Sequence, residues 1–301
     1  MKRIFLFLVT NLAVLVLITI IARVFNIDTA LAQQGVDMGS LLVMAAVIGF
    51  AGSFISLAIS KWSAKHLMGV RVIEQPQNEA QAWLVDVVRR HAERSGIGMP
   101  EVGIFEAREM NAFATGARRD HALVAVSTAL VNGMTQEEAE AVLGHEITHV
   151  ANGDMVTLAL IQGVVNTFVI FLSRVIGTVI DNAISGSRQR EEQRGPGPFY
   201  FLIVIVLQVA LGILANIVVM WFSRQREFRA DEGGAKLAGT GNMIGALERL
   251  DAQHGAPLPG QMAAFGISGN VASGLQRLFM SHPPIAERIA ALRALRQGTS
   301  E

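Results

Sequence analysis

Four long apolar runs, separated by polar stretches, dominate the chain, and the length of each run predicts a membrane-spanning helix. A helix needs ~20 predominantly apolar residues to cross a bilayer. We expect the first two runs to form an N-terminal transmembrane hairpin and the last two to form a second hydrophobic hairpin. For the second hairpin, a buried helical pair that does not span the bilayer is the alternative. The runs are residues 4–22, 41–59, 155–172 and 199–222.

Basic residues at the ends of the first hairpin predict its orientation in the membrane. Lys2 and Arg3 precede the first run, and Lys61 and Lys65 follow the second, whereas residues 24–40 between the two runs hold no Lys or Arg. Because Lys and Arg favour the cytoplasmic side, both ends of this hairpin belong there. We therefore expect the polar parts of the chain to face the cytoplasm.

Residue patterns outside the runs predict helices and a small sheet. Residues 77–93 mix charged and apolar positions at helical spacing, while residues 101–105 and 122–127 are typical of short strands. A charge is costly at mid-membrane, so Arg174 is expected to end the third run. The Gly-, Ser- and Arg-rich residues 181–198 are expected to form a flexible loop.

The predicted architecture is a mainly α (α+β) multi-pass membrane protein. Its polar domain is contributed by two separate parts of the chain and contains the small sheet. The expected segments are a transmembrane hairpin at 1–60, the first part of the polar domain at 61–154, a second hairpin at 155–222 and the second part of the polar domain at 223–301.

One short motif carries metal chemistry, His145-Glu-Ile-Thr-His149, and the residues around it predict a helix. Thr135 can cap the N-terminus of this helix with Glu138 completing a capping box, and a glycine at position 153 can end it. Two histidines four residues apart lie on one helix face, one turn from each other. Such a pair can hold one Zn²⁺, and Glu146 lies beside it as a general base. The alternative is a polar helix face whose histidines are satisfied by hydrogen bonds.

Zinc hydrolases of this kind need a third protein ligand, and Glu227 is the preferred one. Glu227 and Asp231 are four residues apart on a predicted helix, so one carboxylate can bind the metal while the other accepts the N–H of a ligating histidine. The alternative is a charged helix whose carboxylates pair with Arg224 and Arg226. His149 and Glu227 can share a metal only if the two runs between them both span the membrane or both do not. The other downstream candidates are Asp154, Glu232, His254 and His282.

Composition narrows the possible functions further. Hydrophobic residues make up 51% and charged residues 17% of the 301-residue chain, which is typical of a membrane protein. With 25 basic and 25 acidic residues, no basic excess favours nucleic acid as a partner. The chain has no cysteine, so a metal must be held by histidine and carboxylates.

The adjacent glycines 233 and 234 lack a phosphate-loop context, so nucleotide binding is not predicted. The remaining histidines are expected at the surface: His66, His91, His121 and His254.

The order of these motifs along the whole chain resembles the HtpX family, bacterial membrane-bound zinc proteases related to the CAAX prenyl endopeptidases. The matching pieces are the N-terminal hairpin, Asn111-Ala-Phe-Ala-Thr-Gly116, the His145–His149 motif, the second hairpin, Glu227-Phe-Arg-Ala-Asp231 and Ser281-His-Pro-Pro284. The resemblance implies a gluzincin-type endopeptidase with one Zn²⁺ per chain, held by His145, His149 and Glu227. Glu146 would be the base, and Asp231 would orient a ligating histidine.

The resemblance also implies a location and a task. The protein would lie in the bacterial cytoplasmic (inner) membrane with its catalytic domain in the cytoplasm. Its substrates would be polypeptides, in particular damaged or misassembled membrane proteins that accumulate under stress. The lipid bilayer would be its other partner.

Three further residues are assigned roles by the same resemblance. Asn111 would lie on an edge strand that pairs with the substrate backbone, although a turn residue is the alternative. His282 would donate to the oxyanion that develops at the scissile carbonyl, although it can also simply precede a helix that starts with proline. Arg288 would support substrate binding at that site, or be a solvated helix charge.

Three other functions remain compatible with the sequence. One is a zinc hydrolase that acts on something other than protein. An intramembrane zinc protease would carry its motif inside the bilayer, but the acidic residues Glu137, Glu138 and Glu140 just before His145 argue against burial in lipid. A non-catalytic membrane scaffold would use its metal structurally and would need a fourth protein ligand.

Overall fold

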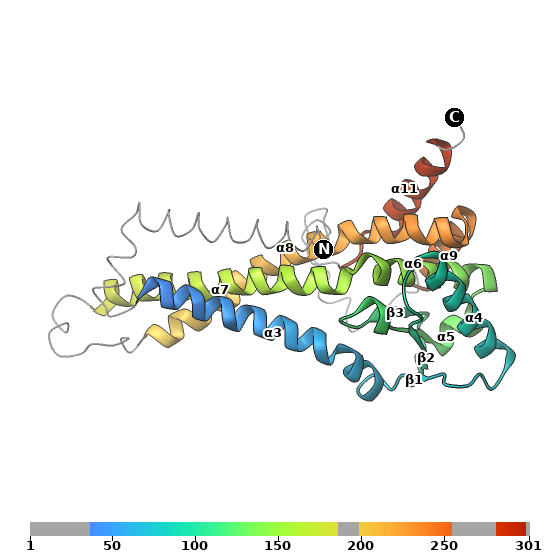
Figure 1. Cartoon of the computed structure of the whole chain (residues 1–301). Helices are drawn as coiled ribbons and strands as arrows, with labels where there is room; N and C mark the ends of the chain where they lie inside the picture. Colours follow the sequence, from blue (N-terminus) through green and yellow to red (C-terminus); the bar gives the residue numbers. More distant parts are fainter. Residues whose placement is uncertain (1–36, 186–198, 255–280, 299–301) are drawn as a thin grey trace. The chain divides into compact units, whose positions relative to one another are not determined.

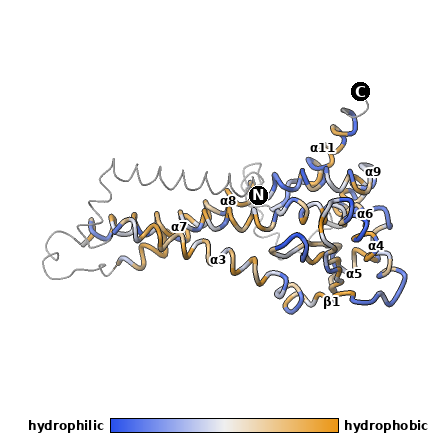
Figure 2. The backbone as a smooth tube through the Cα atoms, viewed as in Figure 1, coloured by the Kyte–Doolittle hydropathy of each residue, from blue (hydrophilic) through white to orange (hydrophobic). Residues whose placement is uncertain are grey.

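The computed structural model describes residues 37–185, 199–254 and 281–298, and it confirms a mainly helical membrane protein with one small sheet (Figure 1). Among the described residues, three helices are long and apolar enough to cross a membrane. Their apolar stretches are drawn in orange in Figure 2. The second and third predicted runs lie within these helices, as does the fourth from residue 200 onward, whereas residues 4–22 lie outside the described part of the chain. The three helices are α3 (Met38–His66), α7 (Asp154–Ser185) and α8 (Tyr200–Ala238).

The chain divides into two compact units. Of the described residues, the first unit comprises 37–55, 159–185 and 199–219, and the second comprises 56–158, 220–254 and 281–298. The three long helices each contribute to both units, because the boundaries fall inside them.

Small residues bring the helices of the first unit into close contact. A Cβ atom added to Gly49 of α3 would lie 2.7 Å from the backbone nitrogen of Thr167 on α7. A Cβ atom added to Gly177 of α7 would lie 2.6 Å from a methyl group of Val204 on α8. Glycine at these positions allows the backbones to approach, which is how helices associate when lipid offers no hydrophobic driving force.

One prediction for α7 was wrong. Residues 181–185 are helical rather than part of a loop, because α7 continues past Arg174 to Ser185. The physical reason is that the sequence after Arg174 is apolar again and buries a face, with Val175 packing beside Phe171 and Leu41. The rest of the expected loop, residues 186–198, lies outside the described residues.

The second unit contains a four-stranded mixed sheet with strand order β1-β2-β4-β3. The central strands β2 (Glu101–Phe105) and β4 (Leu123–Ser127) are parallel, in agreement with the two predicted strands. The edge strands β1 (Arg71–Val72) and β3 (Ala112–Thr115) pair with them in antiparallel fashion. The edge strands have too few residues to show an alternating pattern, so the sequence pattern did not predict them.

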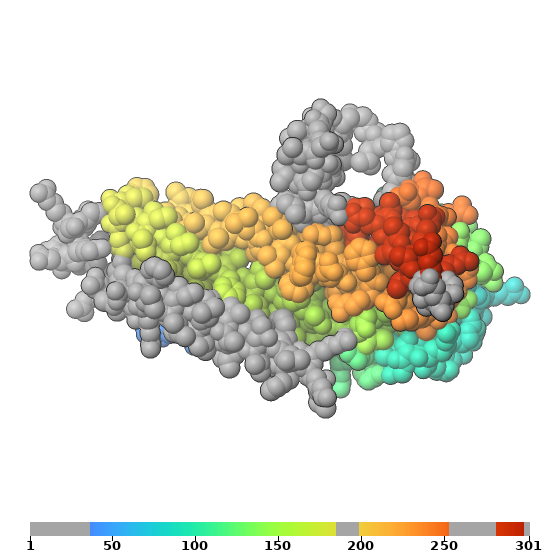
Figure 3. Space-filling view, turned by 90° about the horizontal axis from the view of Figure 1, so that it is seen from above, coloured from blue at the N-terminus to red at the C-terminus, as the bar shows by residue number. Residues whose placement is uncertain are grey.

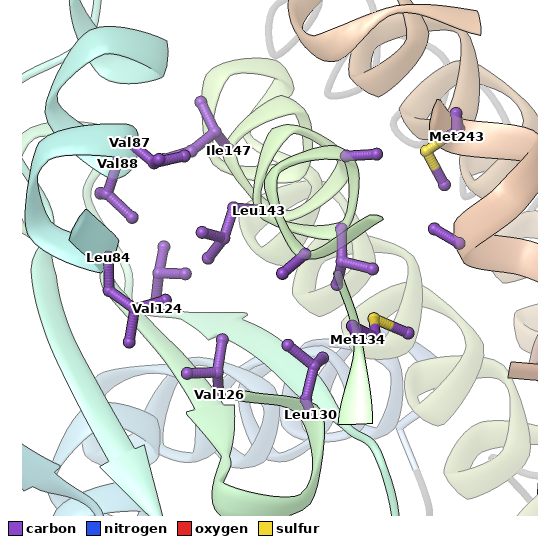
Figure 4. Packing of buried hydrophobic residues seen from close by; sticks show 14 of the residues in the cluster. Leu84, Val87, Val88, Val124, Val126, Leu130, Met134, Leu143, Ile147 and Met243 are labelled. Atoms are coloured by element: carbon purple, nitrogen blue, oxygen red, sulfur yellow. The ribbon is translucent and has the colours of Figure 1, made fainter. Parts of the chain in front are cut away.

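Helices cover both faces of this sheet. On one face, α4 (Glu79–Arg94) and α6 (Gln136–Asn152) enclose a core in which Leu84, Leu143 and Val124 meet (Figure 4). On the other face, Ala64 near the end of α3 packs with Leu123 of β4. The remaining elements of the unit are η1 (Arg119–His121), α5 (Thr128–Gly133), α9 (Thr240–His254) and α11 (Ile285–Gly298). Of these, α11 lies against α9 (Figure 3).

The surface position expected for His91 was wrong. Its side chain is 1% exposed, and its Nε2 lies 3.6 Å from Oε1 of Glu140 on α6. Burial lowers the pKa of His91, so the ring is held neutral inside the packed pair of helices. Helix α4 buries one face against α6, and His91 shares that face with Leu84 and Val88.

The close crossing of α6 and α8 is the packing feature that positions the residues discussed below. A Cβ atom added to Gly234 of α8 would lie 3.0 Å from the backbone nitrogen of His145 and 3.2 Å from the carbonyl oxygen of Ala141. A Cβ atom added to Gly144 of α6 would in turn lie 3.3 Å from the Cα of Gly234. The two helices therefore touch through their backbones at this point.

The ends of α6 form as the sequence predicts. The Thr135 hydroxyl accepts a hydrogen bond from the Glu138 backbone N–H, and the Glu138 carboxylate accepts one from the Thr135 N–H. Gly153 ends the helix with a left-handed conformation, φ 67°, which a residue with a Cβ rarely adopts. These caps hold the His145–His149 turn inside a helix with defined ends.

We predict that Thr135→Ala destabilises the protein by about 1 kcal/mol, because it removes the side-chain acceptor of the capping box. Thermal unfolding of the purified protein in detergent measures the effect. Thr135→Ser keeps the hydroxyl and is the matched control, which should unfold at the wild-type temperature. Equal unfolding temperatures for the Ala and Ser variants would contradict the role of the cap.

Candidate active site

Helix α6 presents two histidines that point at the same spot. His145 and His149 lie one turn apart, with ring centroids 4.7 Å apart and ring planes nearly perpendicular. Their Nε2 atoms are 3.1 Å from each other. The structure therefore brings the two imidazoles together as the motif predicts.

Helix α8 supplies the carboxylate that faces this pair. The Glu227 oxygens lie 3.5 Å from Nε2 of His145 and 3.4 Å from Nε2 of His149. The Glu227 side chain is 2% exposed, so its charge is buried against the two rings. One ligand atom from each of the three residues lies within 4.8 Å of the others, which is compact enough for one metal ion. In the described part of the chain, this is the group whose residue types and spacing suit a metal.

A carboxylate lies close to the Nδ1 atom of each imidazole. Nδ1 of His145 lies 2.9 Å from Oδ1 of Asp231, where the sequence places an orienting carboxylate. Nδ1 of His149 hydrogen-bonds to Oδ2 of Asp154 at 2.7 Å. Asp154 was considered only as a possible third metal ligand, so this partner was missed. The signal was the short separation in sequence, because Asp154 follows His149 by five residues and comes directly after the left-handed Gly153.

The donor set fits a bound cation. With each Nδ1 turned toward a carboxylate, the proton of a neutral imidazole resides there, and each Nε2 presents a lone pair. Two such lone pairs 3.1 Å apart repel each other, and the Glu227 carboxylate adds a negative charge at the same point. A divalent cation held between His145, His149 and Glu227 removes this repulsion, and nitrogen and oxygen donors suit Zn²⁺.

The electrostatics of the site lead to the same conclusion. Burial alone would lower the pKa of His149, but hydrogen bonding to the Asp154 and Glu227 carboxylates outweighs burial and raises that pKa to about 10. The pKa of His145 is also raised, because Asp231 and Glu227 outweigh its burial. The carboxylates thus make this a place where positive charge is strongly favoured.

Arg288 of α11 is part of this charge network. Its Nε and one terminal nitrogen donate to the two oxygens of Asp231 at 2.7 and 2.6 Å, and another nitrogen lies 3.7 Å from Glu227. The Arg288 side chain is buried, which excludes the solvated helix charge considered from the sequence. The planar guanidinium fixes the Asp231 carboxylate in two places, so it holds the partner of His145 in position.

A cavity of about 760 Å³ opens beside the metal-compatible group. Glu146 and Glu227 line it together with His282, whose Nδ1 lies 2.7 Å from Oε2 of Glu227. Asn111 and Arg288 also line this cavity. The cavity therefore gathers all the residues for which the sequence predicted a direct part in catalysis or substrate binding.

Asn111 directly precedes the edge strand β3, and its backbone is held in place by Ser127. The Asn111 N–H donates to Oγ of Ser127 at 2.9 Å, and the Ser127 N–H donates to the Asn111 carbonyl oxygen at 2.8 Å. The same hydroxyl accepts from the Leu130 N–H and so also caps α5. Ser127 was seen only as the end of a strand, and no signal in the sequence pairs it with Asn111.

Arg226 of α8, which the sequence offered as an alternative partner of Asp231, makes other contacts. Arg226 donates to the carbonyl oxygen of Asp154 at 3.3 Å and to Oγ of Ser223 at 2.9 Å, and Asp231 pairs with Arg288 instead. Arg226 thus connects α8 to the turn before Asp154.

The role of glycines 233 and 234 in the close crossing of α6 and α8 was not predicted, because a helix crossing cannot be inferred without knowing which helices meet.

Comparison with known proteins identifies the family. The model of Peptidase family M48 matches residues 78–296. The chain is 60% identical to the Protease HtpX homolog of Thiobacillus denitrificans over 295 residues, which cover 98% of this chain and 100% of that protein. It is 58% identical to Protease HtpX of Thioalkalivibrio sulfidiphilus over 300 residues, covering 99% and 100%.

The fold also resembles a solved structure. The crystal structure of Ste24p from S. mikatae superposes with a TM-score of 0.59 at 18% identity, covering 97% of this chain and 67% of that one. The family match spans strands β2, β3 and β4, the His145–His149 motif and Glu227, and the helices that can span a membrane are long and apolar. The chain therefore belongs to peptidase family M48, among the HtpX proteases, and is a membrane metalloendopeptidase.

Proposed function

We propose that this protein is a Zn²⁺-dependent endopeptidase of the bacterial inner membrane, which hydrolyses peptide bonds on the cytoplasmic side. The observation that carries the proposal is the convergence of His145, His149 and Glu227 beside a cavity that Glu146 also lines. His145, His149 and Glu227 would hold one Zn²⁺. When bound, the ion would polarise the peptide carbonyl and make a water molecule more acidic.

The side chains divide the proton chemistry between them. Glu146 takes a proton from the attacking water and returns it to the leaving amine. His282 donates to the oxyanion that forms at the scissile carbonyl, a type of contact worth about 3–4 kcal/mol in well-studied sites. Asp231 and Asp154 keep the Nδ1 protons on the two histidines, so both Nε2 atoms remain available as ligands.

The edge of the sheet provides a binding mode for an extended polypeptide. Strand β3 pairs with β4 on one side only, and Asn111 at its start lines the cavity. A substrate segment can add to the other side of β3 by main-chain hydrogen bonds, while the Asn111 side chain holds a peptide carbonyl. Arg288 supports the same wall of the cavity through Asp231.

The natural substrates we propose are damaged or misassembled membrane proteins. This assignment is supported by the family resemblance and by the three helices that can span a bilayer. An intramembrane site is disfavoured, because α6 is not one of the helices with the length and hydropathy of a span in the described residues, and it carries Glu137, Glu138 and Glu140. Removal of aberrant membrane proteins under stress is the corresponding cellular task.

We predict that Glu146→Gln retains the metal and lowers peptidase activity by at least ~100-fold, because it removes the base but no metal ligand. Metal content by mass spectrometry and cleavage of an unstructured protein in detergent measure the two effects. Glu140→Gln, on the same helix, is the matched control and should keep wild-type activity. Full activity of the Glu146 variant, in a preparation free of other proteases, would sink the mechanism.

We predict that Gly234→Ala lowers zinc affinity by at least about tenfold, because its Cβ would push α8 away from the backbone of His145 and displace Glu227. Competition with a fluorescent chelator measures the affinity. Gly241→Ala is the matched control, since a Cβ there meets nothing within 4 Å. If both variants bind zinc like the wild type, the helix crossing does not set the metal site.

We predict that the catalytic unit faces the cytoplasm. The chain has no cysteine, so Glu93→Cys, at an exposed position on α4, introduces a single reporter thiol. A membrane-impermeant maleimide should label it in inverted membrane vesicles and not in intact spheroplasts. Labelling in spheroplasts would place the unit on the opposite side and would refute this orientation.

A further inference from the structure

The first unit contains an unpaired cation among apolar helices. Arg174 of α7 is the one basic residue in the described part of this unit. Its Nε is buried without a hydrogen-bond partner, and no described residue forms an ion pair with its guanidinium. Because an uncompensated charge in an apolar setting is costly, its retention points to a partner beyond the described residues.

Arg174 lines a cavity of about 380 Å³ between α3, α7 and α8. Two amide side chains line the same cavity, Asn166 of α7 and Gln208 of α8, and apolar walls come from Ile48 and Ile170. The cavity thus combines one cation and two amides with a hydrocarbon wall. That mixture suits a ligand with an anionic group and an apolar body.

The helix contacts explain why space remains at this point. Gly49 brings α3 against Thr167 of α7, and Gly177 brings α7 against Val204 of α8. Asn166 is adjacent in sequence to the first contact, while Arg174 and Gln208 lie about one helical turn from the second. Asn166, Arg174 and Gln208 therefore lie beside or between the Gly49 and Gly177 contacts, at which the helices are held together.

The amides are set up to donate. Nε2 of Gln162 donates to Oδ1 of Asn166 at 2.9 Å, which leaves the Asn166 amino group free to face the cavity. The side-chain amide of Gln208 contributes further N–H donors. With the five N–H groups of an arginine, the cavity is rich in donors and has no carboxylate in its described lining.

We propose that this cavity binds the phosphate of a membrane phospholipid. A guanidinium fork matches the oxygens of a phosphate, and amide N–H groups complete the donor set. A lipid is favoured over a free anion because exposed apolar side chains lie on the same helices beside the polar group, with Ile48 at 48%, Ile205 at 58% and Val209 at 60% exposure. Acyl chains can lie along these side chains while Arg174 holds the headgroup.

The full-length protein, delipidated in detergent, is titrated with phosphatidylglycerol and with diacylglycerol that carries the same acyl chains, and bound lipid is counted by native mass spectrometry. We expect phosphatidylglycerol to bind at least about tenfold more tightly than diacylglycerol, as two or more charge-assisted hydrogen bonds imply. Arg174→Gln should abolish this preference. Arg71→Gln, which removes an exposed arginine of the other unit, is the matched control and should keep it.

Two further arms keep the test decisive. Gln208→Leu removes one donor without removing the charge, so it should weaken the preference several-fold even if Arg174→Gln fails to fold. Inorganic phosphate is added as a competitor, and we expect it to displace no phosphatidylglycerol at millimolar concentration. Equal lipid preference in the wild type and in both variants would overturn the site, and displacement by inorganic phosphate would overturn its assignment to a lipid.

Discussion

The backbone contact between α6 and α8 is the constraint on which the rest of the active site depends. Gly144 and Gly234 let the two helices touch without intervening side chains. This proximity places a carboxylate from one helix within 3.5 Å of both imidazoles on the other. Any side chain at the crossing would push the helices apart by more than the roughly 0.2 Å by which metal–ligand distances can vary.

Once the helices are this close, charge compensation shapes the remaining contacts. Glu227 and Asp231 are almost fully buried, and buried carboxylates are stable only when they are paired and hydrogen-bonded. Arg288 compensates Asp231, the histidines compensate Glu227 in part, and the proposed divalent cation would complete the balance. The same network that stabilises the packed helices therefore keeps both Nε2 atoms ready to bind metal.

The two units differ in how their buried polar groups are hydrogen-bonded. In the catalytic unit, buried polar groups are paired with one another, as Ser127 shows by bonding the backbone of Asn111 and capping α5. In the unit of long helices, small residues bring the backbones together, but the guanidinium of Arg174 is left without a partner in the described chain. The proposed lipid phosphate would pair with this guanidinium, as buried polar groups pair with one another in the catalytic unit.

The sequence alone determined the features that arise from neighbouring residues. The apolar runs of α3, α7 and α8, the capping box at Thr135 and the shared face of His145 and His149 follow from helical periodicity and local hydrogen bonds. The motif order along the chain indicated the family. The tertiary structure alone decided which distant groups meet: Arg288 on Asp231, and glycine against glycine where α6 crosses α8. These contacts join segments far apart in the chain, so no local pattern encodes them, and burial against a particular neighbour determines each one.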